Sequence, residues 1–210
     1  MKINFKKLAI FGGITIAFLG VGTAVVNAAT TYDSKITQAI NGSVISTDVR
    51  DGSNQVVASP TFIMTPVTAS TSQQTATGTF GSATQRISVD DARGNGSAWT
   101  LALNAKTPGT GTWTSGGNTY KYNETVANGQ LTVNPVPATI TATTGGATGV
   151  TKGTSATFSG TGAITLMSAD ATAAKIWNGY ITGISLSQTI PAGQAVGNYT
   201  IDMVQTVTGT

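Results

Sequence analysis

The sequence contains no histidine and no cysteine, and its only glutamate is Glu124. Without these residues the chain can form no Ser-His-Asp triad, no thiol nucleophile, no zinc site of the usual ligands and no disulfide. A pair of catalytic carboxylates would need aspartates, and the neighbours Asp90 and Asp91 point to opposite faces if they lie in a strand. The residue inventory therefore predicts a non-enzymatic protein without cofactors, stabilised by its core and its sheets alone.

A partial match to a calcium-binding loop follows Asp90. Asp91, Asn95 and Gly96 occupy three of the expected positions, but Arg93 stands where a ligand belongs and Ala102 where the closing glutamate should be. The pattern favours a turn with a local ion pair between Asp91 and Arg93 over a metal site.

Long apolar runs are absent except at the start of the chain. Three lysines precede an apolar run over residues 8–26, which ends in the small residues of Val26-Asn27-Ala28. This order is typical of a secretory signal peptide, which we expect to cover residues 1–28. The alternative is an uncleaved membrane anchor, because the run approaches the length of a bilayer span. Four glycines within the run and its small-residue end favour cleavage.

Charge is also scarce. Three of the eleven basic residues precede residue 29, which leaves eight basic and eight acidic residues and no net charge after cleavage. Nucleic acids and other polyanions are bound through a basic surface, which this composition does not supply. We therefore expect no nucleic-acid partner and, once the signal peptide is removed, no membrane association.

Residues 29–210 are rich in threonine, glycine, serine, alanine and valine and poor in leucine, lysine and glutamate. Threonine and valine suit a pleated sheet, whereas helices favour the residues that are rare here. Short alternating segments between turn residues predict an all-β fold, an antiparallel β-sandwich or barrel-like sandwich of about 10–12 strands. The Gly/Thr-rich run over residues 144–154 is the longest candidate linker, but we expect residues 29–210 to form a single domain.

The stretch from Arg86 to Leu103 is the most strongly patterned. Ile87 and Val89 alternate with polar residues, a Gly-Asn-Gly turn follows, and Trp99 and Leu101 then share a face. The stretch predicts a β-hairpin with a long, glycine-rich loop. Near the end of the chain, alternation predicts a last strand in which Tyr199, Ile201 and Met203 share a face.

Six residues are candidates for ligand binding: Trp99, Leu101, Asp91, Arg93, Trp113 and Tyr120. For Trp99 and Leu101 a place in the core is favoured over direct ligand contact, because alternating large apolar residues usually face inward. Trp113 lies in a glycine-rich stretch expected to be a long loop, and Tyr120 in a short strand that follows. These two rings are placed to form an exposed aromatic platform against a sugar ring.

Two segments carry a resemblance to a known family. Residues 89–101 read VDDARGNGSAWTL, and residues 190–200 read IPAGQAVGNYT. The first is similar to the Asp-x-Arg-Gly and Trp-x-Leu segment of WxL-domain proteins, and the second resembles the segment that precedes their second Trp-x-Leu. This chain has Gln205-Thr206-Val207 where the second Trp-x-Leu would follow. That departure bears on wall binding more than on the fold, because the family's wall binding is attributed to the paired motifs.

The resemblance implies a secreted Gram-positive protein that is held non-covalently on the cell wall, with peptidoglycan or another wall polymer as its partner. We expect neutral contacts to dominate, so that binding depends little on salt. The alternative is a structural subunit of a surface fibre or layer, in which subunits associate by β-strand addition. In that alternative, residues 29–42 would be the donated segment, and the partners would be further copies or other surface proteins.

Overall fold

The computed structural model describes residues 35–210, so the expected signal peptide lies outside the described residues. This part of the chain is all-β and forms fourteen strands. They are β1 (Ile45–Arg50), β2 (Gln74–Phe80), β3 (Arg86–Asp91), β4 (Trp99–Ala105), β5 (Thr112–Ser115), β6 (Asn118–Lys121), β7 (Leu131–Asn134), β8 (Thr139–Thr144), β9 (Val150–Lys152), β10 (Ala156–Thr157), β11 (Ile164–Ala169), β12 (Trp177–Thr182), β13 (Ile184–Ile190) and β14 (Met203–Gly209). None of the described residues belongs to a helix that could span a bilayer.

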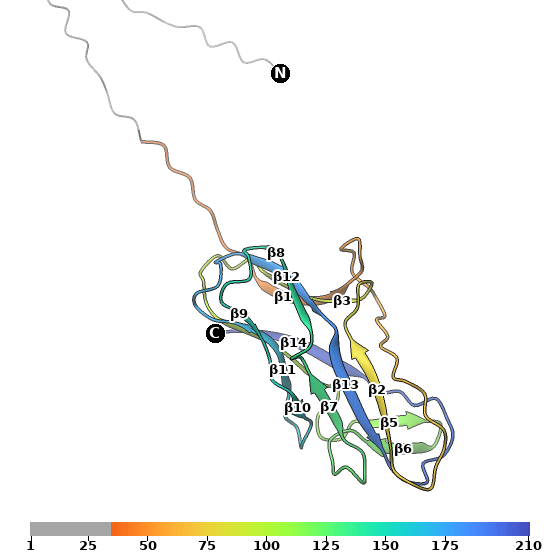
Figure 1. Ribbon diagram of the computed structural model, residues 1–210. Helices are drawn as coiled ribbons and strands as arrows, with labels where there is room; N and C mark the ends of the chain where they lie inside the picture. Colours follow the sequence, from red (N-terminus) through yellow and green to blue (C-terminus); the bar gives the residue numbers. More distant parts are fainter. Residues whose placement is uncertain (1–34) are drawn as a thin grey trace, which may run out of the picture. The chain divides into compact units, whose positions relative to one another are not determined.

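The strands form three antiparallel four-stranded sheets and one two-stranded sheet. The first sheet has the order β1-β3-β12-β8, the second β10-β7-β13-β2 and the third β14-β4-β11-β9, while β5 and β6 form a separate hairpin. Figure 1 shows the sheets packed face to face. The expected antiparallel β-sandwich is confirmed, with a few more strands than predicted.

The first and second sheets are continuous with each other, because strands of one sheet run on into strands of the other. β12 continues into β13 through Gly183 alone, and β2 continues toward β3 through a turn that begins at Gly81. Both glycines have positive φ, +79° and +83°, which side-chain-bearing residues rarely adopt. The Gly183 N–H donates a hydrogen bond to the Gly81 carbonyl at 2.9 Å. These glycines therefore bend one long layer into two sheets at a shared line (Figure 1).

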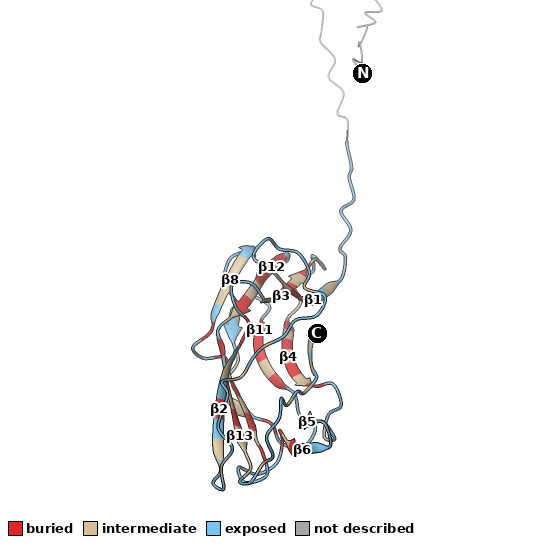
Figure 2. Ribbon diagram, turned by 90° about the vertical axis from the view of Figure 1, so that its right-hand side faces the viewer, coloured by how far each residue is buried: buried red, intermediate tan, exposed pale blue. Residues whose placement is uncertain are grey.

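The core lies between this long layer and the third sheet, where Figure 2 shows buried positions along β4, β11 and β12. The rings of Trp99 on β4 and Trp177 on β12 lie 5.3 Å apart, and Tyr122 packs edge-on against Phe158. Burial alternates along the whole of β4, from Trp99 to Ala105. The prediction that Trp99 and Leu101 belong to the core is confirmed.

The predicted hairpin over residues 86–103 is wrong. β3 pairs with β1 and β12 in the first sheet, whereas β4 pairs with β11 and β14 in the third. The loop between them crosses the sandwich from one layer to the other. Both strands carry an inward apolar face, and packing the two faces against each other buries more surface than pairing the strands side by side.

Residues 40–210 form one compact unit. The glycine- and threonine-rich run over residues 144–154 contributes β9 to the edge of the third sheet, where Val150 pairs with Ala169. Residues 35–39, which precede the compact unit, have no regular secondary structure and are exposed.

Candidate functional site

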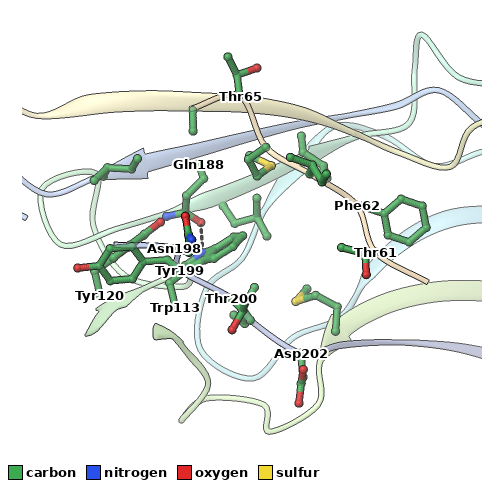
Figure 3. A pocket seen from close by; sticks show the side chains of 18 of the residues that line it. Thr61, Phe62, Thr65, Trp113, Tyr120, Gln188, Asn198, Tyr199, Thr200 and Asp202 are labelled. Carbon is green, nitrogen blue, oxygen red and sulfur yellow. Dashed lines mark hydrogen bonds between the residues drawn. The ribbon is translucent and has the colours of Figure 1, made fainter. Parts of the chain in front are cut away.

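A long groove opens where the two layers of the sandwich part, with a volume of about 1290 Å³. One wall is formed by residues 58–72 together with β2 and β13, and the other by residues 190–205. The groove begins beside Thr47, Asp48 and Val49 of β1 and reaches the β5–β6 hairpin. Figure 3 shows Tyr120, Trp113, Asn198 and Tyr199 gathered at one end and Phe62 toward the other.

Three aromatic rings form the end beside the hairpin, which we call the aromatic end (Figure 3). Trp113 on β5 and Tyr120 on β6 are direct cross-strand partners. Their rings stack at 6.0 Å with an angle of 12° between planes, and Tyr199 packs at 5.1 Å on Tyr120. Cross-strand aromatic pairs of this kind stabilise a short hairpin. The prediction that Trp113 lies in a loop is wrong, because residues 112–115 are a strand.

Gln188 fixes the position of the Trp113 ring. Its side-chain carbonyl accepts a hydrogen bond of 2.8 Å from the indole N–H, and its amide donates to the carbonyls of Lys121 and Thr189. Gln188 is 1% exposed, so these bonds satisfy a buried amide that would otherwise be costly. The indole edge is thus held by β13, and the partly exposed Trp113 side chain lines the groove.

Neighbouring residues of its own segment hold Tyr199 in place. The Tyr199 hydroxyl accepts a hydrogen bond from Gln194 at 2.7 Å and donates to the Ala195 carbonyl at 2.8 Å. Thr200 exchanges two backbone hydrogen bonds with Thr114 of β5, which ties this segment to the hairpin. The predicted last strand therefore starts later than expected, at Met203, because Thr200 pairs with the hairpin instead of with β4.

Tyr120 has an unusual ionisation that can be tested. Burial, with a smaller contribution from Tyr199, raises its pKa from 10.0 to about 12. Because the folded pKa lies above the unfolded one, we expect Tyr120 to contribute stability below about pH 10 and to lose that contribution as the pH rises toward about 12. Tyrosinate absorbance should be followed as a function of pH for the wild type and for Tyr120→Phe. The difference between the two curves should show one tyrosine that titrates near pH 12. A difference that titrates near pH 10 would contradict this assignment.

The other four predicted site residues lie away from the aromatic end. Trp99 and Leu101 are 1% and 0% exposed and form part of the core. Asp91 is buried, and its carboxylate accepts hydrogen bonds from Arg93 Nε at 2.8 Å and Nη2 at 3.0 Å. These bonds raise the pKa of the Arg93 guanidinium above its ordinary value. The structure thus brings together Trp113 and Tyr120 at the groove and places the remaining four in the core and its margin. The prediction of an exposed platform is wrong for Tyr120, which is 9% exposed because Trp113 and Tyr199 pack on its ring, whereas Trp113 is partly exposed.

Arg93 also fastens the loop that crosses between the layers. Its Nη2 donates to the carbonyls of Ser97 at 2.7 Å and Ala98 at 3.2 Å. The guanidinium lies directly against Gly209 of β14, where a Cβ atom would collide with it. The Asp-x-Arg-Gly segment therefore acts as a clamp that joins β3, the crossing loop and β14, and we call it the arginine clamp.

Few charged groups line the groove, and each is paired. Asp48 binds Arg50 in a bidentate ion pair, while Lys106 and Asp202 lie 3.9 Å apart in an exposed pair. Within residues 35–210 no group of three acidic side chains is placed to hold a metal ion. At the partial calcium loop, the Asp91 carboxylate is occupied by Arg93, and the Asn95 side chain accepts a hydrogen bond from the Ser97 N–H.

Sequence reasoning missed two residues that complete the aromatic end. Tyr199 was assigned to a strand, and Gln188 was not singled out. Gln188 does carry a recognisable pattern, because it follows Ile184 and Leu186 at the two-residue spacing of one strand face. A single amide on an otherwise apolar face indicates a buried hydrogen-bonding role.

No family model, curated protein or solved structure matches this chain. The resemblance to WxL-domain proteins therefore stays a prediction. The fold and the groove define the chain as an all-β sandwich with an open, aromatic-ended groove.

Proposed function

We propose that this protein is a secreted, non-enzymatic cell-surface protein that associates non-covalently with the bacterial cell wall, with the aromatic end of the groove as its binding site. The ligand would be a neutral portion of peptidoglycan or of another wall polysaccharide. The observation that carries the proposal is the cluster of Trp113, Tyr120 and Tyr199 in an open groove.

The chemistry of the aromatic end supports a sugar ligand. A sugar ring presents C–H groups on its faces, which pack on aromatic rings, and hydroxyls at its rim, which need hydrogen-bonding partners. Trp113 is partly exposed, and its orientation is fixed in advance by Gln188. The exposed amide of Asn198 lies beside it (Figure 3). A preorganised ring loses little conformational freedom on binding, which favours affinity.

The charges around the groove support a neutral mode of binding and a non-catalytic role. The carboxylates that line the groove are those of Asp48 and Asp202, and each of them pairs with a cation. Lys106, the cation that lines the groove, lies 3.9 Å from Asp202, so the groove has no excess of positive charge to attract an anionic polymer and affinity should change little with ionic strength.

The test is co-sedimentation with isolated Gram-positive walls. We expect the wild type to pellet with the walls at low salt and equally in 1 M NaCl. Trp113→Ala should weaken binding about tenfold, an effect of about 1.4 kcal/mol. Tyr180→Ala is a matched control, because Tyr180 is a partly exposed aromatic residue that does not line the groove. A wild type that stays in the supernatant, or that salt releases, would overturn the proposal.

A second candidate function is a structural subunit of a surface fibre or layer. It is favoured by exposed apolar side chains along both rims of the groove: Ile63 and Val67 on one side, and Val196 and Val204 on the other.

A further inference from the structure

Among the exposed large apolar side chains, two sets differ in their setting. Ile63 and Val196, on opposite rims of the groove, are 80% and 86% exposed. Ile36 and Ile40, in the segment that precedes β1, are 95% and 91% exposed. Exposed apolar side chains that line one groove can serve as an interaction surface.

The floor of the groove is the open interior of the sandwich. Leu131 and Leu186 come from the second sheet and Leu103 from the third, so both layers contribute inward-facing residues. Beside β1 the layers are bridged by a hydrogen bond of 2.9 Å from Gln205 to Thr47. Beyond this bridge the seam between the layers forms the groove, which offers an extended segment an apolar floor.

Both walls present extended backbone to the groove. Within residues 35–210, β14 pairs only with β4. Its other edge lies against β1, where Gln205 bonds to Thr47, and borders the groove at Met203 and Val204. On the opposite wall, residues 61–68 contact β2 through the Met64–Gly78 bridge and the hydrogen bond from Thr65 N–H to the Thr77 carbonyl. Backbone groups on such edges can pair with an added strand.

The segment from Lys35 to Asn41 has the pattern of a strand to be added. Ile36, Gln38 and Ile40 fall on one face of an extended chain, and Lys35, Thr37 and Ala39 on the other. Residues 35–41 are exposed and have no regular secondary structure. Isoleucine favours a strand, and burial of two such side chains would favour docking against the cost of ordering the segment.

The arrangement around Gly42 favours a groove on another molecule over the groove on the same one. The Ser43 N–H donates to the Ala92 carbonyl, the Ala92 N–H donates to the Val44 carbonyl, and Gly42 lies against Arg93. The chain is thus fixed where it enters β1, before it reaches residues 47–49, where the groove begins. To fill its own groove, the segment would have to reverse direction at residues that are already held.

We propose that the groove receives the Ile36–Ile40 segment of a second copy of this chain, which adds as a strand between the two walls. The inference rests on the second candidate function and is independent of wall binding. Because donor and acceptor are different parts of the chain, each copy can give one segment and receive another. Such a head-to-tail contact generates an open polymer unless the rotation between copies closes a ring.

Cross-linking between two different variants tests this pairing, since the natural chain has no cysteine. The full chain carrying Ile40→Cys is mixed with the full chain carrying Val196→Cys and treated with a short bifunctional maleimide. We expect a strong band for the mixed dimer. Val126→Cys replaces Val196→Cys in the control, because Val126 is exposed but does not line the groove. An equal band with the control would overturn the pairing.

Light scattering on charge variants tests assembly itself. The double variant Ile36→Asp/Ile40→Asp should be a single chain. The control Thr37→Asp/Ala39→Asp places the same charges on the opposite face, and a larger fraction of this variant should remain oligomeric. Wild-type oligomers that persist in both variants would overturn this inference and leave the subunit function standing. A strictly monomeric wild type would overturn both. Efficient cross-linking within one chain that carries Ile40→Cys and Val196→Cys would show that the segment fills its own groove, which also contradicts the proposal.

Discussion

Replacement of Asp91 by alanine is expected to lower the free energy of unfolding by about 3–5 kcal/mol, because the substitution leaves a largely buried guanidinium without its counter-ion. The side chains of Arg93 and Asp91 are only 15% and 3% exposed, and Arg93 also holds two carbonyls of the crossing loop. Urea denaturation followed by tryptophan fluorescence measures the loss. The transition should move to lower urea with an unchanged slope.

The chain contains its own control for this experiment. Asp48 and Arg50 repeat the Asp-x-Arg spacing and form the same bidentate pair, with both distances at 2.8 Å. Their side chains are 25% and 23% exposed, and Arg50 clamps no loop. Asp48→Ala should therefore cost about 0–1 kcal/mol, as is usual for ion pairs in contact with water. Equal losses for Asp48→Ala and Asp91→Ala would show that burial and the loop contacts of Arg93 contribute nothing.

Truncation of Trp99 to alanine is expected to cost about 3–5 kcal/mol, the usual range for removing a large aromatic side chain from a core. The ring is 1% exposed and packs on Trp177, whose indole N–H donates to the Gly146 carbonyl at 2.8 Å. Neighbouring strands cannot collapse into a space of this size. Thermal unfolding monitored by near-ultraviolet circular dichroism measures the change.

Trp113→Ala is the comparison for Trp99→Ala. Trp113 is partly exposed at the groove, so its loss should destabilise the fold less than the loss of Trp99. Equal destabilisation by the two substitutions would contradict the placement of Trp99 in the core. The comparison also guides binding experiments, because reduced wall association of Trp99→Ala would report unfolding, whereas reduced association of folded Trp113→Ala would report the site.

The local alternation of apolar and polar residues predicted which segments are strands and which of their side chains face the core. The alternation from Trp99 to Leu103 identified the inward face of β4, and the Ile87–Val89 alternation did the same for β3. Partners were not predictable in the same way. Alternation shows that one face of a strand is buried, but it does not show which element covers that face. Because β3 and β4 are adjacent in sequence and joined by a glycine-rich loop, their pattern predicted a hairpin. Packing of the two apolar faces against each other decides the outcome, and the side chain of Arg93 holds the loop in its crossing path.

The candidate site was predictable only in part. Trp113 and Tyr120 stood out as aromatic residues among glycine and threonine, and the structure places both at the groove. Tyr199 joins them from far along the chain, through the pairing of Thr200 with Thr114. A contact between such distant segments depends on the whole topology and leaves no local pattern in the sequence.

The bent layer has a consequence for the order in which the chain can fold. β12 is the central partner of β3 and β8, and β13 that of β2 and β7, yet these two strands are among the last to be synthesised. Before residues 177–190 emerge from the ribosome, the first two sheets lack the strands that join β3 to β8 and β7 to β2. Folding should therefore follow synthesis instead of accompanying it, and should be slow, as is usual when strands distant in sequence must meet. A chain that stays unfolded until it is almost complete remains suited to passage through a narrow translocation channel.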